Sequence, residues 1–120
     1  MVKTRHEING IIKRYKEALA TLGINPEKVI LYGSYAHDRA REGSDIDLIV
    51  VSSDFGDKNI RERLELLGIA SARIMEPIQA QGYTPDELNS KDRSSFIQEI
   101  LGEKGGTTPD YFIDTALRRI

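Results

Sequence analysis

The chain has 120 residues, of which 39% are hydrophobic and 30% charged, and its formal net charge is -2. The length suits one domain with a single core, and the hydrophobic share excludes a disordered chain. The near balance of charge gives no strong nucleic-acid or membrane signal, and the absence of cysteine excludes disulfides and thiolate chemistry. Because the N-terminal stretch is charged and the apolar runs are short, we expect a cytoplasmic protein.

A helix followed directly by a strand is predicted at the start of the chain. Hydrophobic residues recur at steps of three and four over residues 7–22, which is typical of one face of an amphipathic helix. Gly23 follows the last of them and is expected to end the helix. The β-branched run at 29–33 then predicts a short buried strand.

The next segment contains the chain's most informative pattern. Gly33 and Ser34 follow the first strand, and residues 35–42 could form about two helical turns before Gly43. Residues 45–52, DIDLIVVS, alternate at first and are then continuously hydrophobic. This pattern predicts a strand that emerges at one end of a sheet and is otherwise buried.

A second helix and a third strand are predicted next. Asn59 is a suitable N-cap, and we expect the helix after it to turn Ile60, Leu64, Leu67 and either Ala70 or Ser71 inward. A weaker strand within residues 73–83 is interrupted at Pro77, which favours a sheet edge or a bulge.

The remainder of the chain is predicted to be helical. Thr84 and Pro85 form a typical helix start, and further helices are expected at 92–101 and from Thr108 onward. We therefore predict an α/β fold, a small mixed sheet backed by helices, in a single domain over 1–120 with a helical C-terminal extension at 102–120.

Two carboxylates point to a metal site. Asp45 and Asp47 are two residues apart on a predicted strand, so their side chains share one face. Carboxylates held side by side repel one another unless a cation lies between them. Since no histidine or cysteine is nearby, a hard ion such as Mg²⁺ or Mn²⁺ is favoured, and such ions usually bind substrate phosphates as well.

The glycine-serine turn supplies the complementary half of such a site. Gly33 permits close backbone approach, and Ser34 adds a hydroxyl and amides that attract anions. Taken alone, Gly33 and Ser34 are more simply interpreted as an ordinary strand-to-helix turn with a serine cap. The two aspartates alone are more simply interpreted as solvent-facing residues on an edge strand. Their combination, ten residues apart, favours a nucleoside triphosphate bound with its metal.

The segment GSYAHDRAREGSDIDLIVV, residues 33–51, resembles the signature of the DNA polymerase beta-like nucleotidyltransferases, and most closely their small stand-alone type, the minimal nucleotidyltransferases. The resemblance implies that a nucleoside monophosphate, AMP from ATP, is transferred to an acceptor and pyrophosphate leaves. It also implies that Gly33 and Ser34 hold the triphosphate, and that Asp45 and Asp47 are catalytic and bind magnesium.

The same resemblance suggests a partner. Small members of this family often pair with a HEPN-domain protein, as the antitoxin of a toxin-antitoxin pair that adenylylates the toxin. Because we find no second substrate-binding domain, we expect the acceptor to come from such a partner or from a second subunit of a homo-oligomer. An antibiotic-modifying nucleotidyltransferase is the less favoured alternative.

Three positions depart from the family pattern. Relatives usually carry a third carboxylate on the next strand, where this chain has Gln79, and Glu76 lies three residues earlier. Glutamine can coordinate a cation but cannot accept a proton, so the alternative is a catalytically degenerate nucleotide- or partner-binding module. His37 and Asp38 replace the usual arginine and glycine, while Arg39 and Arg41 are candidate phosphate ligands or solvated residues.

Overall fold

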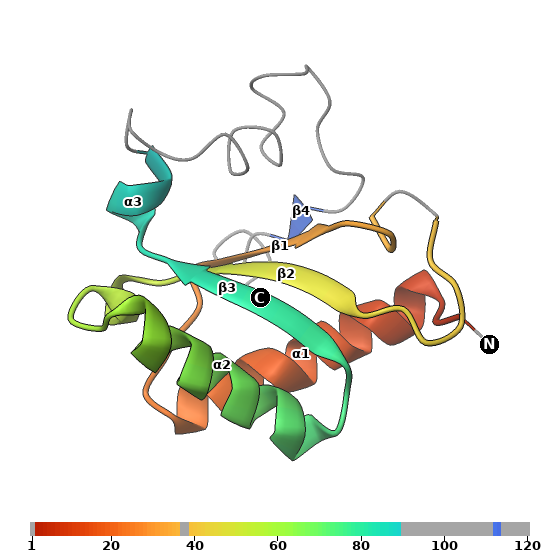
Figure 1. The fold of residues 1–120 in the computed structure, drawn as a ribbon, viewed down its shortest axis with the longest axis horizontal. Coiled ribbons are helices and arrows are strands. Elements are labelled where there is room, and N and C mark those ends of the chain that lie inside the picture. Colours follow the sequence, from red (N-terminus) through yellow and green to blue (C-terminus); the bar gives the residue numbers. More distant parts are fainter. Residues whose placement is uncertain (1, 37–38, 90–111, 114–120) are drawn as a thin grey trace.

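A four-stranded sheet with two helices on one face organises the chain (Figure 1). The computed structural model describes residues 2–36, 39–89 and 112–113. The elements, in chain order, are α1 (Arg5–Thr21), β1 (Lys28–Tyr32), β2 (Ile46–Val51), the 3-10 helix η1 (Ser53–Phe55), α2 (Ile60–Ile74), β3 (Ile78–Tyr83), α3 (Pro85–Asn89) and β4 (Phe112–Ile113).

The sheet is mixed, with strand order β3-β2-β1-β4. β1 pairs antiparallel with β2 and with β4, whereas β2 pairs in parallel with β3. The parallel pair requires a crossover, and α2 provides it. The predicted α/β class, a small mixed sheet backed by helices, is therefore confirmed, and β3 with its preceding Pro77 lies at the sheet edge as expected.

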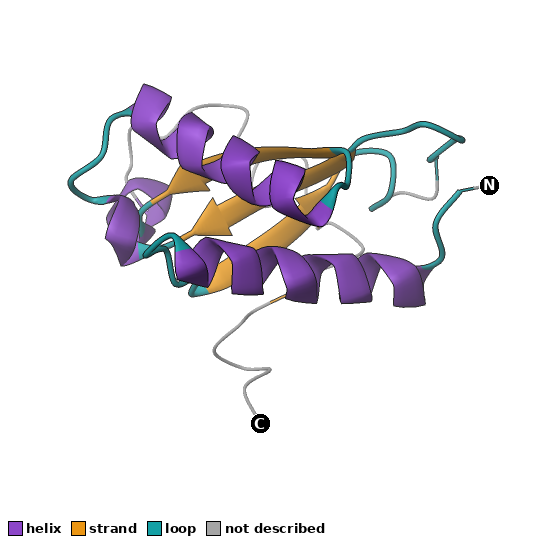
Figure 2. Ribbon diagram, turned by 90° about the horizontal axis from the view of Figure 1, so that it is seen from below, coloured by secondary structure: helices purple, strands orange, loops and turns teal. Residues whose placement is uncertain are grey.

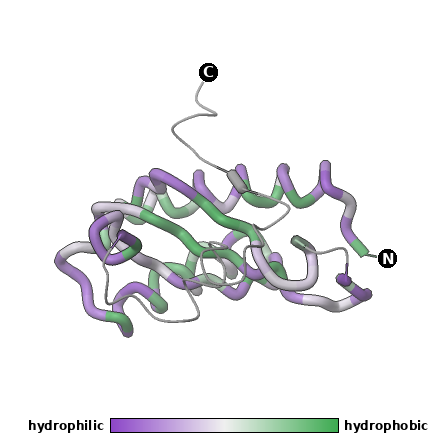
Figure 3. The backbone as a smooth tube through the Cα atoms, turned by 90° about the horizontal axis from the view of Figure 1, so that it is seen from above, coloured by the Kyte–Doolittle hydropathy of each residue, from purple (hydrophilic) through white to green (hydrophobic). Residues whose placement is uncertain are grey.

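Both long helices cover the same face of the sheet (Figure 2). Between them and the strands lies the main core, to which β1 and β2 contribute largely hydrophobic segments (Figure 3). Tyr15 of α1 is fully buried there and donates a hydrogen bond to the carbonyl of Leu67 in α2, 2.9 Å away. The core therefore lies between the sheet and a layer formed by α1 and α2. The opposite face of the sheet is free of these helices.

The predicted helix starts and ends follow from local chemistry. Thr4 and Glu7 form a capping box at the start of α1, and Gly23, with a φ of 88°, follows its end. Asn59 caps α2 as predicted, and Thr84 accepts a hydrogen bond from the backbone of Glu87 at the start of α3.

The predicted inner face of α2 is wrong in part. Ile60 and Leu64 are 74% and 50% exposed, whereas Arg63 is buried together with Leu67 and Ala70. An arginine can take an inward position because its guanidinium and Nε here donate to three backbone carbonyls, those of Phe55, Lys58 and Gly82, and to the carboxylate of Glu87. The stripe that faces the core is consequently rotated away from Ile60 and Leu64.

Two predicted helices are also contradicted. Residues 34–36 form a turn and residues 39–44 contain no helix, since so short a segment does not repay the cost of helix nucleation. In the predicted helical extension at 102–120, Phe112 and Ile113 instead form β4, where they pair with Ile30 and Val29 of β1. Aromatic and β-branched residues suit this sheet position. The remaining predictions for 90–111 and 114–120 lie outside the described residues.

No helix in the described part of the chain is long and apolar enough to cross a membrane.

Candidate nucleotide and metal site

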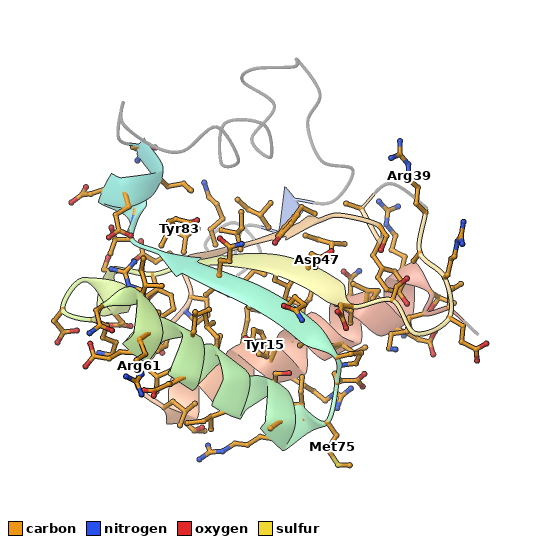
Figure 4. The ribbon with its side chains drawn as sticks, in the orientation of Figure 1. Tyr15, Arg39, Asp47, Arg61, Met75 and Tyr83 are labelled. Carbon is orange, nitrogen blue, oxygen red and sulfur yellow. The ribbon has the colours of Figure 1, made fainter. Side chains whose placement is uncertain are left out.

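The helix-free face of the sheet carries the predicted site residues. In β2, Ile46, Leu48 and Val50 pack in the main core, so the alternating residue Asp47 projects from the other face. Figure 4 shows Asp47 and Tyr83 on this face, with Tyr15 between the sheet and the helices. The face also bears a smaller hydrophobic cluster made by Ile30, Ile49, Val51 and Leu88.

The two halves of the sequence motif lie in contact. Gly33 has a φ of 78°, and a Cβ built on it would collide with the carboxylate of Asp47. The turn is closed by hydrogen bonds from the backbone N–H of Ala36 to the carbonyl of Gly33 (3.1 Å) and from that of Arg39 to the carbonyl of Ser34 (2.8 Å). Glycine is therefore required here both for its backbone conformation and for the space that Asp47 occupies.

The two aspartates interact electrostatically. Partial burial raises the pKa of the Asp47 carboxyl above its ordinary value, and the negative charge of Asp45 raises that pKa further. Asp45 itself is exposed and directly precedes β2. Such mutual repulsion is relieved when a cation binds between two carboxylates.

Strand register places a residue on each side of Asp47. Tyr32 of β1 and Gln79 of β3 are its direct cross-strand partners. Burial raises the pKa of the Tyr32 hydroxyl, and the negative charge of Asp47 adds to that effect. Gln79 is exposed, and because Ile78 and Ala80 pack toward the core, its side chain shares the face of Asp47. An amide thus occupies the position beside Asp47 where the family pattern has an acid.

Glu76 is held elsewhere. Its carboxylate accepts a hydrogen bond from Arg14 of α1 at 3.0 Å and lies 3.9 Å from the ammonium of Lys3. Arg14 belongs to α1, which lies on the face of the sheet opposite Asp47, and Lys3 precedes α1. The structure therefore brings Gly33, Asp47 and Gln79 together and does not bring Glu76 to them.

The described residues contain no group of three or more histidine, cysteine, aspartate or glutamate side chains that could hold a metal ion. Asp45 and Asp47 offer a two-carboxylate donor set, to which the oxygen of Gln79 could add a neutral ligand. Of the two arginines in the following loop, Arg39 points away from the sheet into solvent (Figure 4). His37 and Asp38 lie outside the described residues.

Two features of the site were not specified by the motif itself. Tyr32 is a neighbour of Asp47 because β1 and β2 pair in one register, which could have been inferred from the position of Tyr32 next to Gly33. Tyr83 donates a hydrogen bond of 2.9 Å to Gln81, which extends a polar row along β3 from Gln79. No sequence pattern indicated that bond, since it depends on side-chain orientation.

Comparison with known proteins identifies the family. A family model described as a nucleotidyltransferase domain matches residues 12–112, which is most of the chain. A crystal structure of a protein from Sulfolobus solfataricus, provisionally named a nucleotidyltransferase, is 21% identical, with a TM-score of 0.47, and the match covers 77% of this chain and 86% of that one. No curated protein matches this chain. The family match confirms the resemblance indicated by residues 33–51.

Proposed function

This chain belongs to the nucleotidyltransferase domain family and is a nucleotidyl-transferring enzyme, and we propose that it transfers AMP from ATP to an acceptor in the cytoplasm with the help of Mg²⁺ or Mn²⁺. One observation carries the proposal: the backbone of Gly33 packs directly against the carboxylate of Asp47. A phosphate bound at the turn and a metal bound at the carboxylate would therefore be immediate neighbours.

The donor set fits a hard divalent ion. Asp45 and Asp47 offer only oxygen ligands. Burial raises the pKa of Asp47, and the negative charge of Asp45 raises it further, as expected of a site that lacks a compensating positive charge. When bound, such an ion would offset negative charge on the phosphate oxygens during the displacement. Asp45 and Asp47 would hold it, and Gln79 would complete the set as a neutral ligand.

The turn residues would hold the triphosphate. Gly33 allows a phosphate to approach the backbone closely, and Ser34, which is half-buried, can donate its hydroxyl and amide. Arg39 and Arg41 are exposed in the loop that leads to Asp45 and would attract the anionic substrate. These residues bind and orient the donor, so that an acceptor can attack the α-phosphorus in line with the leaving pyrophosphate.

We further propose that the acceptor belongs to a partner protein of the HEPN type, with this chain acting as the antitoxin of the pair. The family resemblance supports this role. A second subunit of this chain is the other source of an acceptor.

A second candidate is favoured by a specific observation. Gln79 pairs directly with Asp47, and Glu76 is bound to Arg14 instead. A chain that has lost the third acid could keep nucleotide or partner binding without transfer. This candidate and the enzyme differ in one measurable property, the appearance of AMP on an acceptor.

Transfer is measured with ATP that carries a radioactive α-phosphate, MgCl₂ and the protein encoded by the neighbouring gene as the proposed partner. We expect label on that partner, and a loss of at least about 10³-fold in Asp45→Asn and Asp47→Asn, because a bound metal supplies several kcal/mol of charge stabilisation. Asp57→Asn is the matched control, since Asp57 is an exposed carboxylate in the loop beyond β2. Partner binding that survives both site substitutions without any labelling would favour the degenerate module.

A further inference from the structure

The surroundings of Asp47 raise the question of how an acceptor would lose its proton. A hydroxyl acceptor must give up a proton as it attacks phosphorus, and a positioned base normally takes it. Asp45 and Asp47, as the ligands of a cation, would have their lone pairs engaged. Any base must therefore be another group on the same face of the sheet.

The cross-strand neighbours of Asp47 cannot serve as that base. On β3 the neighbour is Gln79, whose amide does not accept a proton, and on β1 it is Tyr32, whose phenol is protonated at neutral pH. Beyond Gln79 along β3, the same face carries Gln81, which accepts a hydrogen bond from Tyr83. In residues 28–32, 45–51 and 78–83, the helix-free face thus carries no acid besides the two proposed metal ligands.

Glu76, the acid that shortly precedes β3, is occupied by other partners. It contacts Arg14 and Lys3, and its side chain is 19% exposed. Moving it to Asp47 would break its charge-assisted hydrogen bond with Arg14. Glu76 therefore does not substitute for the missing acid.

We propose that the acceptor attacks through an oxygen that is already ionised at neutral pH, a phosphate or carboxylate group, and not through a hydroxyl. The inference rests on the proposed function and narrows its acceptor class. A partner protein would then present a phosphorylated or a carboxylate side chain. Arg39 and Arg41, exposed in the loop before Asp45, would favour such an anion electrostatically.

The reaction needs no base with such an acceptor. An anionic oxygen of the acceptor forms a bond to the α-phosphorus of ATP, while the bond from that phosphorus to the α,β-bridging oxygen breaks. The bridging oxygen leaves with the bonding electron pair as part of pyrophosphate. Orthophosphate would give ADP, and acetate would give acetyl adenylate. Water or glycerol would have to lose a proton as well, which these neighbours of Asp47 do not accept.

The test supplies four acceptors to the full chain with ATP and MgCl₂. Transfer to radioactive orthophosphate is detected as ADP labelled in its β-phosphate. Transfer to acetate is detected as the hydroxamate that forms when hydroxylamine traps acetyl adenylate. Transfer to water gives AMP, and transfer to glycerol gives glycerol esterified with AMP. We expect the wild type to use phosphate or acetate at least about 10²-fold faster than water or glycerol, which is the lower range of a general base's contribution. The faster of the two anions distinguishes a phosphate from a carboxylate acceptor.

The decisive variant restores a carboxylate beside Asp47. Gln79→Glu should raise transfer to water and glycerol about 10²-fold and raise transfer to phosphate or acetate far less. Gln81→Glu is the matched control, because it places the same charge on the same strand and face, two residues further on, and should not give the gain. A structural role of Gln79 alone would change all four acceptors in parallel.

Three results would overturn the inference. The wild type could use glycerol as readily as phosphate, Gln79→Glu could leave the preference unchanged, or hydroxyl transfer could vanish in His37→Asn, which would locate a base within this chain. If transfer depends on Asp47 but prefers glycerol, this inference alone fails. If neither the wild type nor Gln79→Glu transfers AMP to any of these acceptors or to the partner protein, the proposed function fails with it.

Discussion

The two faces of the sheet differ in what their side chains do. On the face covered by α1 and α2, Ile46, Leu48 and Val50 are fully buried and their neighbours are hydrophobic. On the other face, the alternating residue Asp47 is partly exposed and has its pKa raised by burial and by Asp45. One six-residue strand thus stabilises the fold through every second residue and presents the candidate site residue Asp47 between them.

The helix-free face is itself divided along the strands. At the end where β1 meets the glycine-serine turn, it is polar and contains Gly33, Asp47 and Gln79. At the other end, Ile49 and Val51 cluster with Leu88 of α3. The charged site therefore lies beside hydrophobic surface, and reduced hydration of this kind strengthens the interactions of a bound cation and phosphate.

Leu48→Ala should show the largest loss of stability. The side chain is fully buried in the main core, so its truncation should lower the free energy of unfolding by about 3 kcal/mol. Chemical denaturation measures the loss. Leu64→Ala, at a position that is 50% exposed, is the matched control and should cost less than about 1 kcal/mol. Equal losses at the two positions would mean that burial in the main core is not what makes Leu48 stabilising.

Gly33→Ala should damage both stability and activity. The residue has a positive φ, and a Cβ would displace the carboxylate of Asp47, so we expect a cost of about 1–2 kcal/mol and a fall in transfer of about 10²-fold. Denaturation and label transfer measure the two effects.

Gly23→Ala separates the backbone effect from the collision. Gly23 has a φ of 88° with open space around its Cβ position, far from the site in the chain. This control should lose similar stability and keep its activity. If Gly33→Ala also kept full activity, close contact between the turn and Asp47 would not matter to the reaction.

The parts of this site that are local in sequence could be predicted from it. A glycine after a hydrophobic run indicates a turn, and a residue between the buried residues of a strand lies on the other face. The contact of Gly33 with Asp47 therefore needed only the two strands to form a hairpin. The place of Gln79 beside Asp47 came from the family pattern, and the parallel register of β2 and β3 agrees with it.

What could not be predicted depends on contacts distant in sequence. Periodicity places Ile60 on the inward face of α2, but Arg63 is the buried residue there. Its burial is possible because acceptors from three other segments, including Gly82 and Glu87, satisfy the guanidinium of Arg63. Likewise, Phe112 and Ile113 are compatible with a helix or a strand by pattern alone, and pairing with the free edge of β1 decides between them.

Glu87→Gln tests the ion pair that anchors α3 at the hydrophobic end of the helix-free face. Hydrogen bonds from Arg63 hold the pKa of Glu87 below its ordinary value of 4.5, and the backbone of Thr84 adds to that effect. The stabilisation is therefore complete above that value and is lost as pH falls through the lowered pKa. We expect a loss of about 1 kcal/mol near neutral pH, because the carboxylate is partly exposed, and a difference from wild type that shrinks as pH falls below 4.5.

Glu65→Gln is the control for that measurement. Glu65 forms an exposed pair with Arg61 one helical turn away, at 3.6 Å, and its loss should cost only about 0.3 kcal/mol. A pH-independent effect of Glu87→Gln would show that packing, and not the charge, holds α3.

Asp47→Asn should give the smallest change in stability, and this change should be a gain, whereas most substitutions cause a loss. Because burial and Asp45 raise the pKa of Asp47, the folded chain binds this proton more tightly than the unfolded chain does. The contribution of this group to stability is therefore present below its ordinary value of 3.8 and is lost as pH rises through the raised pKa. Without metal, Asp47→Asn should melt slightly above wild type near neutral pH and match it at about pH 3.

Asp57→Asn should have the opposite sign, because Lys58 lowers the pKa of Asp57 and makes its charged form favourable in the folded chain. Melting temperatures with EDTA and with excess MgCl₂ measure all three proteins. Magnesium should raise the melting temperature of wild type and of Asp57→Asn, and leave Asp47→Asn nearly unchanged, since only a chain that binds the ion is stabilised by it. If Asp47→Asn melted below wild type in EDTA, repulsion at this face would already be relieved by the chain itself, and the case for a cation between Asp45 and Asp47 would fall.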